Sequence, residues 1–209
     1  YEYTCAILDN GSLKCWGTNS NGQLGNGGSG SGVQSPPSTP IDLGTGRTAV
    51  ALSAGAQHTC AILDNGDMKC WGHDSNGQLG DGGTTTNSLA PSSTAIDLGT
   101  GRTAVANTGG LLHTCAILDN GDVKCWGSDS LEQLGNGAAT GNVLTPSSTP
   151  IDLGTGRTAV AISAGEYHTC ATLDNGDVKC WGYDWAGQLG DGGSNTNQDS
   201  PIALSLIHI

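Results

Sequence analysis

The stretch HTCAILDNGDMKCWG, residues 58–72, places two cysteines on either side of an Asp-Asn-Gly segment. It returns nearly unchanged as YTCAILDNGSLKCWG at 3–17, HTCAILDNGDVKCWG at 113–127 and HTCATLDNGDVKCWG at 168–182. An Asp-Asn-Gly segment between two β-prone runs predicts a β-hairpin. The sequence therefore describes one hairpin unit that is copied along the chain.

The unit recurs at a constant step of 55 residues, and a second block, IDLGTGRTAVA, begins at Ile41, Ile96 and Ile151. Each unit contains a β-prone run such as TAVALSA (48–54), the two hairpin strands, and a weaker fourth strand at AIDL or PIDL. No segment shows helical periodicity. These features predict an all-β fold of β-propeller blades, each a four-stranded antiparallel sheet. The single repeat domain, 1–209, divides into units of approximately 1–55, 56–110, 111–165 and 166–203.

We expect the two cysteines of each unit to form a disulfide across the hairpin. If Asp9-Asn10-Gly11 is a three-residue turn, Cys5 faces Cys15 at a distance that a disulfide can bridge. Closing so small a loop stabilises each hairpin by about 2–3 kcal/mol. Buried free thiols and a metal site are the alternatives, but zinc ligand pairs are usually closer in sequence. The predicted pairs are Cys5–Cys15, Cys60–Cys70, Cys115–Cys125 and Cys170–Cys180.

The composition limits the classes of partner. The chain has 7 Lys and Arg against 19 Asp and Glu, a formal net charge of −12. This balance argues against a nucleic-acid partner, whose phosphates are bound by Lys and Arg. No apolar run approaches the roughly 18 residues that span a bilayer, so we expect no membrane insertion. Paired cysteines indicate an oxidising compartment, which is extracellular or at the cell surface.

The run HTCAILDNGDVKCWG, together with NGQLG at 21–25 and 76–80, resembles the regulator of chromosome condensation repeat, a family of seven-bladed β-propellers. The cysteine pair, where the family usually has small polar residues, resembles its secreted prokaryotic members. The resemblance implies several unrelated roles: nucleotide exchange on the Ran GTPase, chromatin binding and inhibition of β-lactamases. Because only four hairpins are present, we interpret the chain as a fragment of a longer propeller, with a closed four-bladed ring as the alternative. The tail 204–209 resembles sequencing-adapter read-through in metagenomic translations and is a candidate artefact.

Several repeated polar residues could carry chemistry. The histidines at one phase either bind backbone carbonyls where strands converge or form a ring for a metal ion. The arginines either pair with the preceding aspartates or carbonyls, or form an arc for an anion. The histidines are His58, His113 and His168; the arginines are Arg47, Arg102 and Arg157, and the aspartates are Asp42, Asp97 and Asp152.

Two further patterns bear on metals and catalysis. Asp64, Asn65 and Asp67 either bind their own backbone, as turn residues usually do, or offer oxygens to calcium. The run DSNGQLGDG at 74–82 lacks the ligand order of a calcium loop. No nucleophile and base are arranged for catalysis, so we expect a protein that is not an enzyme and has no catalytic residue, metal or cofactor.

The positions that differ between copies are the best candidates for a binding site. Tyr183 and Trp185 stand where the first unit has Thr and Ser, and His73 and Leu131 are also unique to their units. Aromatic residues on loops are favoured binding anchors. We therefore predict an extracellular recognition module that binds a protein or glycan through its variable loops. One alternative is that Trp185 packs on its neighbouring blade or on a missing one. Another is that the chain is a guanine-nucleotide exchange factor for a small GTPase, which would need a reducing compartment.

Overall fold

The computed structural model describes residues 2–84, 87–138, 141–193 and 196–204. The described residues form antiparallel sheets and include no helix that is long and apolar enough to cross a membrane. The first sheet has the order β1-β2-β3, the second β4-β5-β6, the third β7-β8-β9 and the fourth β10-β11-β12-β13. The strands are β1 (Tyr3–Ile7), β2 (Leu13–Asn19), β3 (Gly30–Val33), β4 (Ala49–Ala54), β5 (His58–Leu63), β6 (Met68–Gly72), β7 (Ala104–Gly109), β8 (His113–Leu118), β9 (Val123–Gly127), β10 (Ala159–Ala164), β11 (His168–Leu173), β12 (Val178–Gly182) and β13 (Gln198–Ala203).

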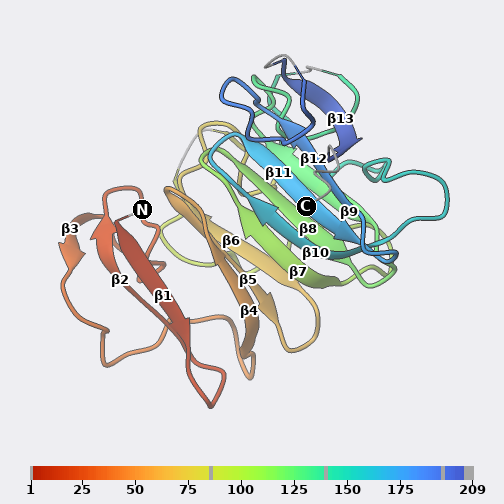
Figure 1. Ribbon diagram of the computed structural model, residues 1–209. Coiled ribbons are helices and arrows are strands. Elements are labelled where there is room, and N and C mark those ends of the chain that lie inside the picture. Colours follow the sequence, from red (N-terminus) through yellow and green to blue (C-terminus); the bar gives the residue numbers. More distant parts are fainter. Residues whose placement is uncertain (1, 85–86, 139–140, 194–195, 205–209) are drawn as a thin grey trace.

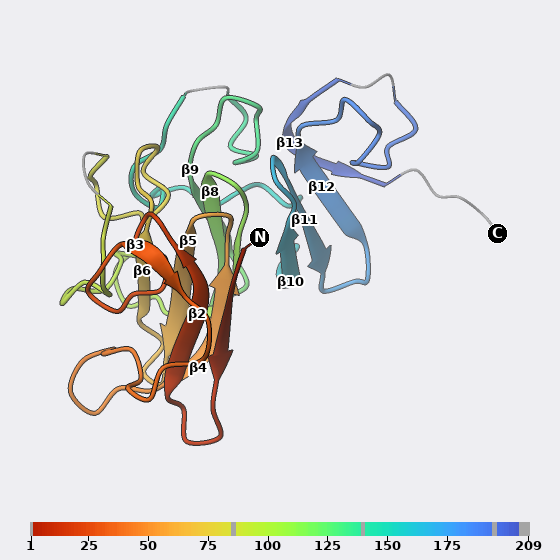
Figure 2. The same cartoon turned by 90° about the vertical axis from the view of Figure 1, so that its left-hand side faces the viewer.

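The sheets are propeller blades that stand next to one another in an open row (Figure 1). The sheet β1-β2-β3 lies at one end of this row and β10-β11-β12-β13 at the other, as the turned view also shows (Figure 2). The β-propeller prediction is therefore confirmed, whereas the alternative of a closed four-bladed ring is wrong. Strand β4 falls in sequence unit 1–55 but pairs with β5, and β7 and β10 likewise precede the units of their hairpins. The second, third and fourth sheets therefore begin before the unit that supplies their hairpin. Of the predicted tail, 205–209 lie outside the described residues.

The hairpins have the register that the sequence predicts. Cys5 lies opposite Cys15 and Ile7 opposite Leu13, with Gly11 at φ 76° in the turn. The positive φ explains the glycine, because other residues rarely adopt it. All four predicted disulfides are present, and the described residues include no free cysteine.

The prediction of a fourth strand at AIDL or PIDL is wrong. Ile41 only donates its backbone N–H to the carbonyl of Leu13, over 2.8 Å, and the residues around it are not in a strand. The outer edge is instead formed by β3 and β13, and by isolated bridges from Gly72 to Ser88 and from Gly127 to Val143. This short apolar run is thus joined to the hairpin by a backbone hydrogen bond but does not continue the sheet.

The hydrophobic core consists of clusters that each lie between two neighbouring blades. In one of them the Cys60–Cys70 disulfide packs with Leu118 and Trp126 of the next blade. Equivalent clusters surround Trp71 and Trp181. These three tryptophans have no exposed surface. Burying a large aromatic side chain is a major source of stability, so the blades stabilise one another.

One carbonyl group joins each pair of blades. The backbone oxygen of Gln78 accepts hydrogen bonds from Trp126 Nε1 (3.1 Å) and from Thr114 Oγ1 (2.8 Å) of the next blade. Gly80 lies directly beneath the indole, where a Cβ atom would be 2.6 Å from Trp126 Nε1. Gln23 and Gln133 form the same joint with the blades that follow them. The repeated NGQLG motif, altered to LEQLG in the third unit, is therefore a joint between blades.

Candidate functional site

The blades have two ends that differ in what they carry. We call the end with the Asp-Asn-Gly hairpin turns the turn face. The opposite end, where β1, β5, β8 and β11 begin, is the loop face. Its loops include 20–29, 73–84, 128–138 and 183–193.

On the loop face, backbone hydrogen bonds hold two variable side chains next to each other in every blade. In the fourth blade the N–H of Tyr183 binds the carbonyl of Tyr167 over 2.9 Å. Their rings meet edge to face, with centroids 6.1 Å apart. The residues at the equivalent positions, in blade order, are Glu2 with Thr18, Gln57 with His73, and Leu112 with Ser128. One scaffold therefore presents a different pair in each blade.

Trp185 is the most exposed large apolar residue among those described. Its side chain is 71% exposed, and it lies in the loop that follows Tyr183. At this exposure the described residues of the neighbouring blade do not cover Trp185, and packing on a further blade stays an alternative. Tyr167 adds a third aromatic ring to this end of the row. In the sequence, Tyr167 is distinguished only because the equivalent positions of the other units hold Glu, Gln and Leu.

The other two predicted binding residues lie in other blades. His73 is half-buried, and its Nδ1 accepts a hydrogen bond of 2.7 Å from the side-chain amide of Gln78. Burial lowers the pKa of His73. Leu131 is half-buried, and its N–H donates to Gln133 Oε1. His73, Leu131 and the aromatic residues are thus distributed over three successive blades rather than gathered in one pocket.

A hollow of about 360 Å³ lies on the loop face between the first two blades and the third. Glu2, Thr18 and Ser20 come from the first blade, Gln57 from the second and Leu111 from the third. Gln57 and Leu111 were not among the predicted binding residues. They could have been found as Tyr183 was, because their positions also hold different residues in different units.

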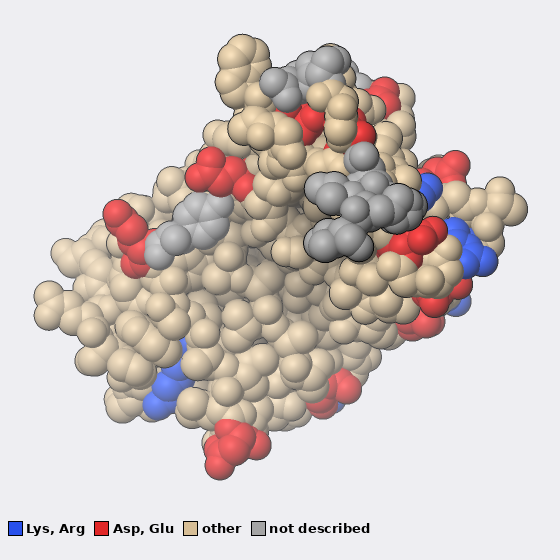
Figure 3. Space-filling model, viewed as in Figure 1, with Lys and Arg blue, Asp and Glu red and all other residues tan. Residues whose placement is uncertain are grey.

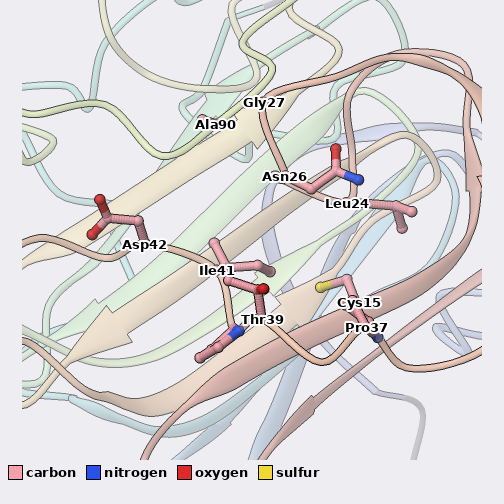
Figure 4. Close-up of a pocket in the computed structure, with 11 residues that line it drawn as sticks. Cys15, Leu24, Asn26, Gly27, Pro37, Thr39, Ile41, Asp42 and Ala90 are labelled. Carbon is pink, nitrogen blue, oxygen red and sulfur yellow. The ribbon is translucent and has the colours of Figure 1, made fainter.

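A second kind of hollow recurs at the rim of the molecule. Leu24, Pro37 and Ile41 surround a cleft of about 350 Å³, which Ala90 of the next blade closes (Figure 4). Equivalent clefts of about 170 and 320 Å³ lie one and two units further along, closed by Thr145 and Ser200. Because this cleft follows the repeat, it is a consequence of blade packing and does not distinguish one blade from another.

His58 and His113 bind threonine hydroxyls, so for these two histidines the predicted bond to a backbone carbonyl is wrong. His58 Nε2 lies 2.9 Å from Thr114 Oγ1, and His113 Nε2 lies 2.9 Å from Thr169 Oγ1. Each hydroxyl donates to a glutamine carbonyl, so the imidazole Nε2 carries the proton. Burial lowers the pKa of His58 to about 4 and that of His113 to about 3, with smaller contributions from neighbouring histidines.

The metal-ring alternative for these histidines finds no support in the described part of the chain. No group of three or more His, Cys, Asp or Glu side chains is arranged there to hold a metal ion. His58 and His113 each contact a threonine of the next blade instead. Both therefore belong to the joints between blades.

On the turn face, each arginine pairs with an aspartate of the next hairpin. Arg47 lies 3.3 Å from Asp64, and the pairs Arg102–Asp119 and Arg157–Asp174 repeat this contact. The predicted partner, Asp42, instead accepts the backbone N–H of Gly44. Asn65 accepts the N–H of Asp67 and donates to its carboxylate, which is the expected bonding within the turn.

The third blade keeps its geometry despite its unusual sequence. Glu132 stands where the other units have glycine, and it adopts φ 65°, close to the 78° of Gly77. Strand β7, which carries the altered NTGGLL sequence in part, pairs with β8 in the same register as β4 with β5. A left-handed glutamate costs backbone energy, and the surrounding blade holds it in place.

Comparisons with known proteins agree with this architecture. Two models described as the regulator of chromosome condensation (RCC1) repeat match residues 10–62 and residues 49–78, 108–133 and 159–188. The chain belongs to this family. Its RCC1 repeats carry a disulfide in each hairpin.

Curated relatives align over nearly all of the chain. The ultraviolet-B receptor UVR8 of Arabidopsis thaliana is 30% identical over 203 residues, which are 97% of this chain and 44% of the receptor. Protein pim1 of Schizosaccharomyces pombe is 31% identical over 195 residues, 90% of this chain and 34% of pim1. The human E3 ubiquitin-protein ligase HERC2 is 28% identical over 205 residues, 98% of this chain and 4% of the ligase. The chain spans less than half the length of these relatives.

Solved structures show the same fold. Human WBSCR16 superposes with a TM-score of 0.85 at 20% identity, covering 99% of this chain and 51% of that protein. Yeast RCC1 (Prp20), solved bound to Kap60, gives a TM-score of 0.82 at 18% identity over 99% of this chain and 47% of that protein. At this identity the likeness establishes the fold alone.

Charge is distributed unevenly over these RCC1 repeats. By their place in the strands and turns, all seven Lys and Arg belong to the turn face or to the half of a blade next to it. In the view of Figure 3, blue side chains appear only near the margins of the molecule. Two of the lysines, Lys69 and Lys124, are buried against backbone carbonyls. The loop face carries no Lys or Arg among the described residues. Its carboxylates are those of Glu2, Asp74, Asp81, Asp129, Glu132, Glu166, Asp184, Asp191 and Asp199.

Proposed function

We propose that the chain is part of an extracellular or cell-surface recognition module, not an enzyme, that binds a protein partner through its loop face. The observation that carries this proposal is the aromatic group of the fourth blade. Trp185, two residues after Tyr183 in the same loop, is 71% exposed, and the ring of Tyr183 meets that of Tyr167 edge to face. An exposed tryptophan offers a large contact area at a low entropic cost, and such residues dominate binding energies.

The scaffold suits this role. Four disulfides and the joints between blades hold the loops in place, so little order has to be gained on binding. The acidic loop face disfavours nucleic acid, because it would repel phosphates. Protein partners are known for structural neighbours: yeast RCC1 (Prp20) was solved bound to Kap60, and the Prp20p structure from Saccharomyces cerevisiae was reported with its binding properties to Gsp1p and histones.

The binding test uses matched variants at the two faces. A displayed peptide library is selected on the oxidised chain, and the selected peptides are titrated against Trp185→Ala and Val105→Ala. Val105 is a 57% exposed apolar residue of β7 near the turn face, so it controls for loss of exposed apolar surface. We expect Trp185→Ala to weaken binding by roughly tenfold or more and Val105→Ala to leave it unchanged. Equal affinity for both variants, or binding only to a glycan array, would overturn the proposal of a protein partner on this face.

The compartment is tested separately by the state of the cysteines. The chain is exported through an oxidising compartment, its free thiols are blocked without reduction, and its peptide linkages are mapped. We expect no free thiol and Cys60 joined to Cys70, because disulfides persist outside reducing compartments. Free or scrambled cysteines in active protein would contradict the extracellular assignment and favour the intracellular exchange-factor alternative.

A further inference from the structure

Each blade contains a buried polar residue at the start of its loop, with a second polar residue seven positions later. The first residue is at most 3% exposed in every blade. One of its side-chain oxygens always accepts a backbone N–H five residues later: Asn19 binds Leu24 over 3.0 Å, and Asp74 binds Leu79 over 3.0 Å. The pairs are Asn19 with Asn26, Asp74 with Asp81, Asp129 with Asn136, and Asp184 with Asp191.

The first blade shows where the other side-chain atom of this residue points. Asn19 Nδ2 donates to Asn26 Oδ1 over 3.2 Å and to the carbonyl oxygen of Gly28 over 2.9 Å. An amide group is therefore placed between two oxygen acceptors. This arrangement is complete, because each oxygen receives a hydrogen from Asn19.

In the second blade both members of the pair are aspartates, and the donor is lost. A Cβ atom on Gly83 would lie 3.8 Å from Asp74 Oδ2 and 3.2 Å from Asp81 Oδ1, so both carboxylates approach the same small space. Asp74 is 2% exposed. Its burial, together with the nearby charge of Asp81, raises the pKa of Asp74 to about 6. Asp81 Oδ1 accepts the N–H of Gly83 over 2.8 Å, but among the described residues no amide stands between the two carboxylates as in the first blade. A cation bound between them would offset their repulsion.

The fourth blade repeats the substitution. Asp184 is 1% exposed, and its Oδ1 accepts the N–H of Leu189 over 2.8 Å. Its Oδ2 is buried and accepts no hydrogen bond from the described residues. Asp191 occupies the partner position, and no Lys or Arg lies on the loop face in the described part of the chain to supply the charge.

We propose that the two all-aspartate pairs, Asp74 with Asp81 and Asp184 with Asp191, each bind a calcium ion. Carboxylate and carbonyl oxygens are the ligands that calcium prefers, and its coordination is flexible enough to be completed by water. Magnesium fits less well because it demands octahedral geometry and gives up its water reluctantly. With only two carboxylates for each ion, affinity is weak, with a dissociation constant on the order of 10⁻⁴ to 10⁻³ M.

The test rewrites both pairs as the pair of the first blade. In the variant Asp74→Asn, Asp81→Asn, Asp184→Asn, Asp191→Asn, each new amide can donate as Asn19 does, so the blades keep their fold without calcium. The matched control removes the same charge from the hairpin turns, with Asp9→Asn, Asp67→Asn, Asp122→Asn and Asp177→Asn. Both variants and the parent chain are oxidised, and their disulfides are verified.

Calcium is titrated into each protein after treatment with a chelator, by calorimetry at neutral pH, and thermal unfolding is followed with calcium or magnesium at equal ionic strength. We expect the parent chain and the turn control to bind two calcium ions and to gain roughly 5 °C in Tm at about ten times the dissociation constant, with a smaller gain in magnesium. The rewritten variant should show neither effect. A calcium response in the rewritten variant, or none in the natively folded parent chain, would overturn the proposal. If the parent chain shows no calcium response, the acidic pairs hold protons instead of calcium. The Tm of the rewritten variant should then be higher than that of the parent chain above pH 7.

Discussion

The turn face and the loop face are built from the two ends of the same strands, yet only the turn face repeats. On the turn face, Arg47, Arg102 and Arg157 each meet an aspartate of the following hairpin at nearly the same distance. On the loop face, the positions equivalent to Tyr183 hold Thr, His and Ser. What repeats maintains the blade, and what varies is available for recognition.

The largest difference in stability between a substitution in the scaffold and one on the loop face should be that between Trp126→Ala and Trp185→Ala. Trp126 is fully buried between blades, and Trp185 is 71% exposed. We expect Trp126→Ala to lower the free energy of unfolding by about 3–5 kcal/mol, because it leaves a cavity and removes a bond to the carbonyl of Gln78. Trp185→Ala should change it by less than about 0.5 kcal/mol. Chemical denaturation of both variants measures this difference, and comparable losses would contradict the division.

Acid should weaken the joints beneath the loop face. The pKa values of His58 and His113 are about 4 and about 3 in the folded chain, below the ordinary 6.5. The unfolded chain therefore takes up protons first, so stability is present above pH 6.5 and is lost as the pH falls towards the folded values. Asp74 acts in the opposite sense between its folded pKa of about 6 and its ordinary 3.8.

The net loss between pH 6.5 and 5 should be about 2 kcal/mol, because both histidines outweigh Asp74 over this range. Denaturation at a series of pH values measures it. In His113→Gln, whose amide can still donate to Thr169, the slope should be shallower. A slope that the substitution leaves unchanged would show that other groups cause the acid sensitivity.

The smallest effect should come from the turn face itself. Arg102 and Asp119 are each 37% exposed, so water screens their contact. Arg102→Ala should lower the free energy of unfolding by at most about 1 kcal/mol, and less in high salt. A loss as large as that of Trp126→Ala would mean that the turn face contributes more to stability than a screened ion pair can.

The sequence was most informative where structure is local. The Asp-Asn-Gly turn determines the register of its own hairpin, so Cys5 opposite Cys15 could be derived from spacing alone. The partner of Arg47 could not, because Asp42 and Asp64 are both close in sequence and only the path of the next hairpin selects Asp64. Likewise, the partners of His58 and His113 lie in the following blade, a full repeat away.

The candidate site was predictable only in part. Tyr183 and Trp185 could be found because they break the repeat, but Tyr167 departs from a position that already varies and so gave a weaker signal. The pair of Asp74 and Asp81 was harder still. Its sequence lacks the order of a calcium loop, and its meaning depends on the burial of Asp74 and on comparison with Asn19.

The carbonyl of Gln78, bound by Trp126 and Thr114 of the next blade, has a consequence for how such chains change in length. Every joint offers the same acceptor on one side and the same donors on the other. A unit duplicated or deleted in whole by recombination therefore meets compatible neighbours at both of its boundaries. Stability in such an array approximates a sum over units and their nearest-neighbour contacts. Genes of this kind can therefore gain or lose whole blades, one at a time, while each intermediate protein still folds.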